Sequence, residues 1–135
     1  MNEDELREFL ERALTATVST VGRGGRPHAV PVWYRFREGV FVVWTDASRR
    51  WVKNLYHRPH VSIVVAEQQP PFAAVVARGS AEIATEEPVG NEDVRLLVER
   101  YVGADEAAAY IEQWSMLKTI VRVRAERVRS WGRGY

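Results

Sequence analysis

Residues 40–65, VFVVWTDASRRWVKNLYHRPHVSIVV, are the stretch that decides the fold of this chain. Both ends of the stretch are continuous apolar runs rich in β-branched residues, which is typical of strands buried on both faces. Apolar residues between the two runs recur at helical spacing and form one stripe, made of Trp51, Val52, Leu55 and Tyr56. Pro59 lies just beyond the stripe, where it would end a helix. The stretch therefore predicts a strand, a tight turn, a short helix and a second strand.

The start of this short helix gathers groups that suit an anion. Asp46 or Ser48 can cap it, which places Ser48, Arg49 and Arg50 in the first turn, with Lys53 one turn later on the same side. Free N–H groups and the positive end of the helix dipole attract anions at this position. A hydroxyl and three cations there predict a phosphate-binding seat. The alternative is an ordinary surface helix with solvated basic side chains.

The composition indicates one domain, residues 1–135, which is enough chain for a hydrophobic core. The formal net charge of +1 does not favour nucleic-acid binding. The absence of cysteine excludes disulfides and thiolate chemistry. No apolar run approaches the ~20 residues that span a bilayer, and the acidic, amphipathic start of the chain is not a signal peptide. We therefore expect a cytoplasmic protein without a membrane partner.

Outside the central stretch, the same criteria predict further strands and helices. Strands are expected over Thr15–Val21, His28–Phe36, Val40–Thr45, His60–Ala66, Ala73–Thr85 and Leu117–Trp131. Helices are expected from Asn2 or Asp4 to Leu14, over Asn91–Val102, and from Asp105 to Trp114. Six strands joined mostly by turns, with a few flanking helices, predict a small, mainly β, antiparallel barrel.

Two residues predict irregular places in these strands. Pro31 cannot donate a ladder hydrogen bond, so we expect it at an edge, a bulge or a break in pairing. Gly79, in the middle of a long strand, indicates a bulge or a close approach of another backbone.

No pattern of directly catalytic side chains is present in the sequence. His28, His57 and His60 lie on different predicted elements without carboxylates at metal-ligand spacing, so we expect no metal site. Ser48 has no recognisable base partner. Catalytic residues stay unassigned, and any chemistry would be carried by a cofactor.

Six segments together resemble the pyridoxamine 5'-phosphate oxidase-like, FMN-binding split-barrel family: Gly25–Trp33, Thr45, Ser48–Arg50, Asn54–Leu55, Arg58–Ser62 and Arg78–Ile83. The resemblance covers roughly residues 15–83, in the same order of strands and helix. The family includes FMN proteins and proteins that use the deazaflavin coenzyme F-420. The resemblance implies a six-stranded antiparallel split barrel.

The resemblance also implies where a cofactor would bind. The flavin ring would lie along Val30, Pro31, Val32 and Trp33 and against the strand end at Thr45. The phosphate would be held by the first turn of the short helix, which agrees with the seat formed by Ser48, Arg49, Arg50 and Lys53. A homodimer with two cofactors at the subunit interface is implied as well. Trp33 can contact the ring or belong to the core.

One position departs from the family pattern. Members commonly have Ser-Arg-Lys where this chain has Arg49, Arg50 and Trp51, so Trp51 replaces a phosphate-binding lysine. Arg49 or Lys53 could supply the missing charge. A tryptophan followed three residues later by Asn54 and Leu55 resembles the deazaflavin-dependent nitroreductase branch.

The resulting expectation is an FMN- or F-420-dependent oxidoreductase that reduces a small unsaturated or quinone-like substrate. Oxidation of pyridoxamine phosphate itself is not expected, because the segments that complete such an enzyme are not evident. Two alternatives stay open: a non-catalytic, dimeric protein that binds or sequesters a flavin, and a dimeric scaffold without a cofactor.

Overall fold

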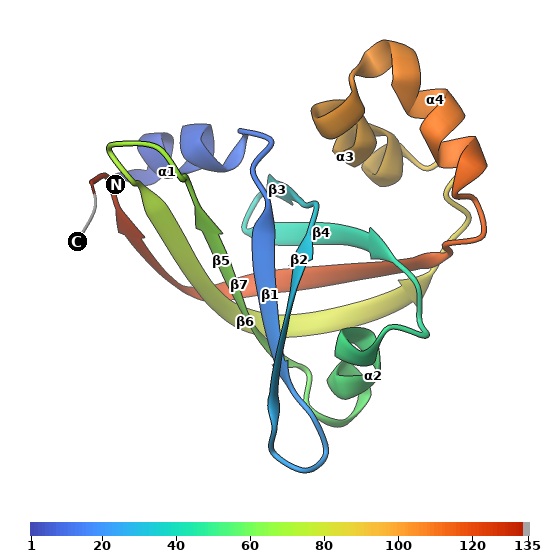
Figure 1. Ribbon diagram of the computed structural model, residues 1–135, viewed down its shortest axis with the longest axis horizontal. Coiled ribbons are helices and arrows are strands. Elements are labelled where there is room, and N and C mark those ends of the chain that lie inside the picture. The colour runs from blue at the N-terminus through green and yellow to red at the C-terminus, as the bar shows by residue number, and fades with distance from the viewer. Residues whose placement is uncertain (134–135) are drawn as a thin grey trace.

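The computed structural model describes residues 1–133, which form seven strands and four helices (Figure 1). The strands are β1 (Ala16–Val21), β2 (Pro27–Val32), β3 (Arg35–Arg37), β4 (Val40–Thr45), β5 (His60–Ala66), β6 (Ala74–Thr85) and β7 (Thr119–Trp131). The helices are α1 (Glu3–Leu10), α2 (Arg50–His57), α3 (Glu92–Val102) and α4 (Ala104–Gln113). In this part of the chain no helix is both long and apolar enough to cross a membrane.

All strands belong to one curved antiparallel sheet in the order β2-β1-β5-β6-β7-β4-β3 (Figure 1). The long strands β6 and β7 pair along their whole length and carry the sheet from one half to the other. The two edge strands, β2 and β3, are consecutive in the chain but do not pair with each other in the described structure. The sheet is therefore open between them, which leaves one edge of β2 unpaired.

Residues 28–36, expected as one strand, form two strands, which is why the sheet has seven strands and not six. The break lies at Trp33 and Tyr34. The Tyr34 N–H donates to the Tyr101 hydroxyl at 3.1 Å instead of to a neighbouring strand, and its side chain is fully buried. Pro31 lies in the edge strand β2, as its missing N–H predicted.

The first helix ends at Leu10, four residues earlier than expected. The reason is tertiary. The Leu10 carbonyl, which would accept from the Leu14 N–H in a longer helix, accepts from Arg100 at 3.2 Å, and the carbonyls after it also bond to distant side chains. The Arg12 carbonyl accepts from Arg100 at 2.8 Å and from the Tyr34 hydroxyl at 3.2 Å. The Leu14 carbonyl accepts from the Tyr101 hydroxyl at 2.8 Å.

The core has two parts separated by β4 and β7. Val43 and Val121 face the barrel interior, whereas Val42 and Ile120 face α3 and α4. Strand β4 is thus buried on both faces, as its continuous apolar run predicted. The same prediction is wrong for β5, whose burial alternates, because its outer face is only half covered at Val64.

Gly79 lies at a shift of register between β6 and β7, so the predicted bulge is confirmed. A Cβ at this position would overlap the carbonyl oxygen of Arg124 on β7. The two backbones approach so closely that only glycine fits without displacement.

A network of charged residues fixes α3 on the sheet. The Arg122 guanidinium of β7 donates to Glu86 at 2.7 Å and to Asp93, in the first turn of α3, at 2.9 Å. Arg35 of β3 donates to the other Asp93 oxygen at 2.8 Å. Three segments distant in sequence are held together in this way, and the α3–α4 pair is placed beside the open end of β2.

Candidate functional site

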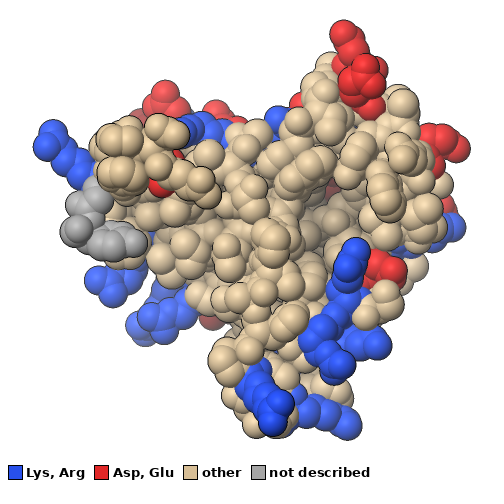
Figure 2. Space-filling model, in the orientation of Figure 1, with Lys and Arg blue, Asp and Glu red and all other residues tan. Residues whose placement is uncertain are grey.

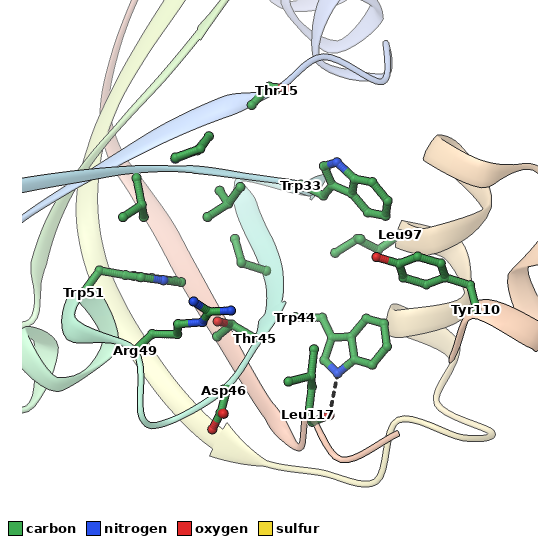
Figure 3. A pocket seen from close by; sticks show the side chains of 14 residues that line it. Thr15, Trp33, Trp44, Thr45, Asp46, Arg49, Trp51, Leu97, Tyr110 and Leu117 are labelled. Carbon is green, nitrogen blue, oxygen red and sulfur yellow. Dashed lines mark hydrogen bonds between the residues drawn. The ribbon is translucent and has the colours of Figure 1, made fainter. Parts of the chain in front are cut away.

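A cavity of about 590 Å³ lies where β2 and β4 end and α2 begins, with α3 and α4 forming its far wall (Figure 3). Small-molecule sites commonly measure ~300–1,000 Å³, so a cavity of this size suits an organic cofactor or substrate. Its lining consists of Thr15, Val30–Trp33, Val43–Asp46, Arg49, Trp51, Leu97, Tyr110 and Leu117.

One side of the cavity is the C-terminal end of the edge strand β2 with the residue that follows it, from Val30 to Trp33. Strand β2 pairs with β1 on one side only, so peptide groups on its other side have no strand partner in the described chain. Unpaired peptide groups on an edge strand can bond to a ligand that carries donors and acceptors along its own edge. This side of the cavity therefore offers an amide edge flanked by valine side chains.

The indole ring of Trp33, at the end of this peptide edge, begins an aromatic wall. The Tyr110 ring of α4 packs against Trp33, with ring centroids 5.5 Å apart, and against Trp44, with centroids 6.4 Å apart. The Trp44 Nε1–H donates to the Leu117 carbonyl at 2.6 Å, shown by the dashed line in Figure 3. Such flat, apolar walls suit a planar conjugated ring.

Arg49 is the cation at the cavity, and its side chain extends between Trp51 and Thr45 (Figure 3). Asp46 lies beside it. The backbone N–H and the hydroxyl of Ser48 donate to the Asp46 carboxylate at 3.2 and 3.0 Å. These bonds, with Arg49 nearby, hold the pKa of Asp46 below its usual value, so this carboxylate is ionised at neutral pH.

The first turn of α2 has no side-chain cap, because Arg49 occupies the N-cap position. The expectation that Asp46 or Ser48 caps this helix is wrong, since these two side chains bond to each other. Within the described chain, the N–H groups of Arg50 and Trp51 have no hydrogen-bond partner. The start of α2 thus keeps two free donors near Arg49, which favours an anion.

The predicted site residues fall into two groups. Val30, Pro31, Val32, Trp33, Thr45 and Arg49 line the same cavity. Ser48, Arg50 and Lys53 do not line it: Ser48 is bonded to Asp46, and the other two are exposed on α2. A phosphate role for these three stays a prediction.

Trp51, the departure from the family pattern, is only 3% exposed and belongs to the barrel core. Its ring edge also reaches the cavity beside Arg49 (Figure 3). Trp51 therefore packs in the core beneath the cavity. The cationic side chain that lines the cavity beside it is Arg49.

Trp44, Leu97, Tyr110 and Leu117 were not anticipated as site residues, although they line the cavity. Of these four residues, Leu97 and Tyr110 lie in segments that the sequence predicted as helices, Asn91–Val102 and the segment from Asp105 to Trp114. A predicted helix does not by itself indicate which distant element it packs against.

Positive charge gathers around α2 and the β1–β2 turn at the lower end of the molecule (Figure 2). The exposed cations there are Arg23, Arg26, Arg49, Arg50, Lys53 and Arg58. Within the described chain, none of the six forms an ion pair shorter than 4 Å. Over residues 1–133, no group of three or more His, Cys, Asp or Glu side chains could hold a metal ion.

A family model described as pyridoxamine 5'-phosphate oxidase matches residues 2–132. No curated protein matches the chain. The conserved hypothetical protein Rv2991 from Mycobacterium tuberculosis has a similar structure, with a TM-score of 0.84 and 30% identity over 97% of this chain and 84% of that chain. The predicted fold, an antiparallel sheet with flanking helices, is confirmed by this likeness.

Two further solved structures share the fold at lower identity. An F420 reductase has a TM-score of 0.72 and 23% identity over 91% of this chain and 94% of that chain. A FAD-binding protein from Mesorhizobium loti has a TM-score of 0.67 and 17% identity over 96% of this chain and 94% of that chain. At these identities the likeness concerns the fold alone.

Proposed function

The chain belongs to the pyridoxamine 5'-phosphate oxidase family, and from that premise we propose that it is an oxidoreductase with a flavin-type cofactor, FMN or deazaflavin F-420. Its substrate would be a small unsaturated or quinone-like molecule. The observation that carries the proposal is the meeting of two features at one cavity: the unpaired edge of β2 and the uncapped, basic start of α2.

The ring of a flavin or deazaflavin fits the first feature. It is planar and has donors and acceptors along one edge, which the peptide groups of Val30–Trp33 can match. Thr45, which is 9% exposed, lines the cavity beside the end of β2. Both cofactors share this ring shape, so the ring side does not distinguish between them.

A phosphate fits the second feature. The free N–H groups of Arg50 and Trp51 and the guanidinium of Arg49 can bind phosphate oxygens together. Arg50 and Lys53 add positive charge from the exposed side of α2. The lysine replaced by Trp51 would then be compensated by Arg49.

The cofactor supplies the hydride or electrons when bound, and the chain supplies binding and orientation. Asp46 and Arg49 are the charged side chains among the described lining residues. Because the proposed substrate is uncharged, its reduction needs few charged side chains beyond these two. The names of the F420 reductase and the FAD-binding protein add support for this class of cofactor.

We also propose a homodimer with a cofactor at each subunit interface. The outer face of the sheet supports this arrangement, because Val64 and Val76 lie opposite each other on β5 and β6 and are both half-exposed. Two half-exposed valines side by side on a sheet face offer an apolar contact to a second copy. Sedimentation at equilibrium should give twice the mass of one chain.

Titration of FMN and of F-420 into the purified apo protein, followed by cofactor fluorescence, tests the proposal. Saturable one-to-one binding of either cofactor is expected, and binding of neither would overturn it. Reduction of menadione with the loaded protein and a reductant then separates an oxidoreductase from the alternative, a dimeric protein that binds or sequesters a flavin without turnover.

A further inference from the structure

We infer that the aromatic wall of the cavity is the substrate subsite, and that the Tyr110 hydroxyl selects substrates with a carbonyl oxygen on a planar conjugated ring. The inference rests on the proposed function, since it leaves the peptide edge of β2 and the start of α2 to the cofactor and assigns the aromatic side chains to the substrate. It adds a residue of α4 that determines which substrate is bound.

The wall consists of two indole rings and one phenol ring. The ring planes of Trp33 and Tyr110 are inclined by 32°. The rings of Trp44 and Tyr110 meet edge to face, with their planes inclined by 72°. Leu97 and Leu117 fill the space around them (Figure 3). This half of the cavity contains no charged side chain among the described residues, so it favours an uncharged, flat ligand.

The wall is held in place before any ligand binds. Trp33 is stacked on Tyr101 from behind, with centroids 4.5 Å apart. Trp44 is held by its bond to the Leu117 carbonyl. Rings that are already fixed lose little freedom when a planar ligand packs against them, which makes binding more favourable.

The Tyr110 hydroxyl is the polar group of this wall that points into the cavity (Figure 3). It has no hydrogen-bond partner among the described residues. The Trp44 N–H is already used, and the indole nitrogen of Trp33 lies on the side of its ring away from Tyr110 (Figure 3). A phenol donates well to a carbonyl oxygen, so a quinone oxygen would complete the bond that Tyr110 lacks.

Paired ligands that differ only in oxygen test this inference. Menadione carries two carbonyl oxygens, and 2-methylnaphthalene has the same carbon skeleton without them. Both are titrated into wild type and Tyr110→Phe by tryptophan fluorescence quenching, with and without saturating cofactor. The chain has no cysteine, so the quinone cannot form a thiol adduct. Tyr56→Phe, an exposed tyrosine on α2, is the matched control.

Loss of one neutral hydrogen bond should weaken menadione binding roughly 2- to 10-fold in Tyr110→Phe. The Kd of 2-methylnaphthalene and the Kd of the cofactor should not change, and Tyr56→Phe should behave as wild type. The substitution removes only a hydroxyl, and unchanged near-ultraviolet circular dichroism would verify that the ring packing persists.

Equal weakening of both ligands, or no change for menadione, would overturn the role of Tyr110. Failure of wild type to bind either ligand would overturn the subsite itself. If neither FMN nor F-420 binds but menadione still loses affinity selectively in Tyr110→Phe, the proposed function fails while the subsite stands.

Discussion

The indole ring of Trp33 lies flat on the phenol ring of Tyr101, with centroids 4.5 Å apart and planes inclined by 1°. The Tyr101 hydroxyl accepts from the Tyr34 N–H at 3.1 Å and donates to the Leu14 carbonyl at 2.8 Å. One residue of α3 therefore supports the cavity wall, ends β2 and anchors the segment before β1. Burial raises the pKa of Tyr101, so the neutral phenol needed for these bonds persists at neutral pH.

Tyr101→Phe should destabilise the protein, because it leaves the Tyr34 N–H without its acceptor. The expected loss in the free energy of unfolding is about 1–3 kcal/mol, measured by urea denaturation. The stacking with Trp33 should survive. A variant as stable as wild type would show that water replaces the hydroxyl at this place.

Gly79→Ala should be among the most damaging single-methyl changes in the chain, because the new Cβ would overlap the Arg124 carbonyl. We expect a loss of ~1–3 kcal/mol or more, as for overpacking of a rigid interior. Gly24→Ala is the matched control, since nothing lies within 4 Å of its Cβ position. Thermal unfolding of the two variants should differ clearly, and similar midpoints would contradict the close approach.

The Glu86–Arg122 pair should make stability depend on pH in the acid range. Hydrogen bonding from Arg122, with help from Asn91, lowers the pKa of Glu86 in the folded protein. In the unfolded chain the pKa of this carboxyl group is 4.5. Because its pKa is lower in the folded protein, the group stabilises the fold at pH values above 4.5, and this stabilisation is lost as the pH falls through the folded-state pKa.

Glu86→Gln should therefore be less stable than wild type at pH 7, and the gap between them should shrink as the pH is lowered below 4.5. Urea midpoints across this range give the measurement. Glu87→Gln, which removes only an exposed ion pair with Lys118, should show little gap at any pH. A gap for Glu86→Gln that is constant with pH would rule out the ionic contribution.

Arg50→Glu should weaken cofactor binding without unfolding the protein, because Arg50 is exposed at the start of α2. Arg49→Glu should weaken it more, since Arg49 lines the cavity. Loss of a charge-assisted bond to phosphate corresponds to roughly 10- to 100-fold in Kd. Arg7→Glu on α1, outside the cavity, makes the same charge change as a control. Unchanged affinity in both α2 variants would exclude this helix from the site.

Local sequence patterns were sufficient for much of the framework. The apolar runs at 40–45 and 60–65 and the stripe from Trp51 to Tyr56 predicted strand, helix and strand, since side-chain period depends on local backbone geometry alone. Pro31 predicted an edge, a bulge or a break in pairing, and Gly79 a bulge or a close backbone approach, for equally local reasons: a missing N–H and a missing Cβ. The residues of the β2 side of the cavity followed from the family resemblance.

What only the tertiary structure decided depends on contacts between distant residues. The early end of α1 and the break at Tyr34 come from hydrogen bonds to Arg100 and Tyr101, about 70 to 90 positions away in the chain. The aromatic wall exists because the Arg122 network holds α3 on the sheet, which brings Tyr110 of α4 beside Trp33 and Trp44. Periodicity shows which face of a helix is apolar, but the packing of distant elements determines what that face meets.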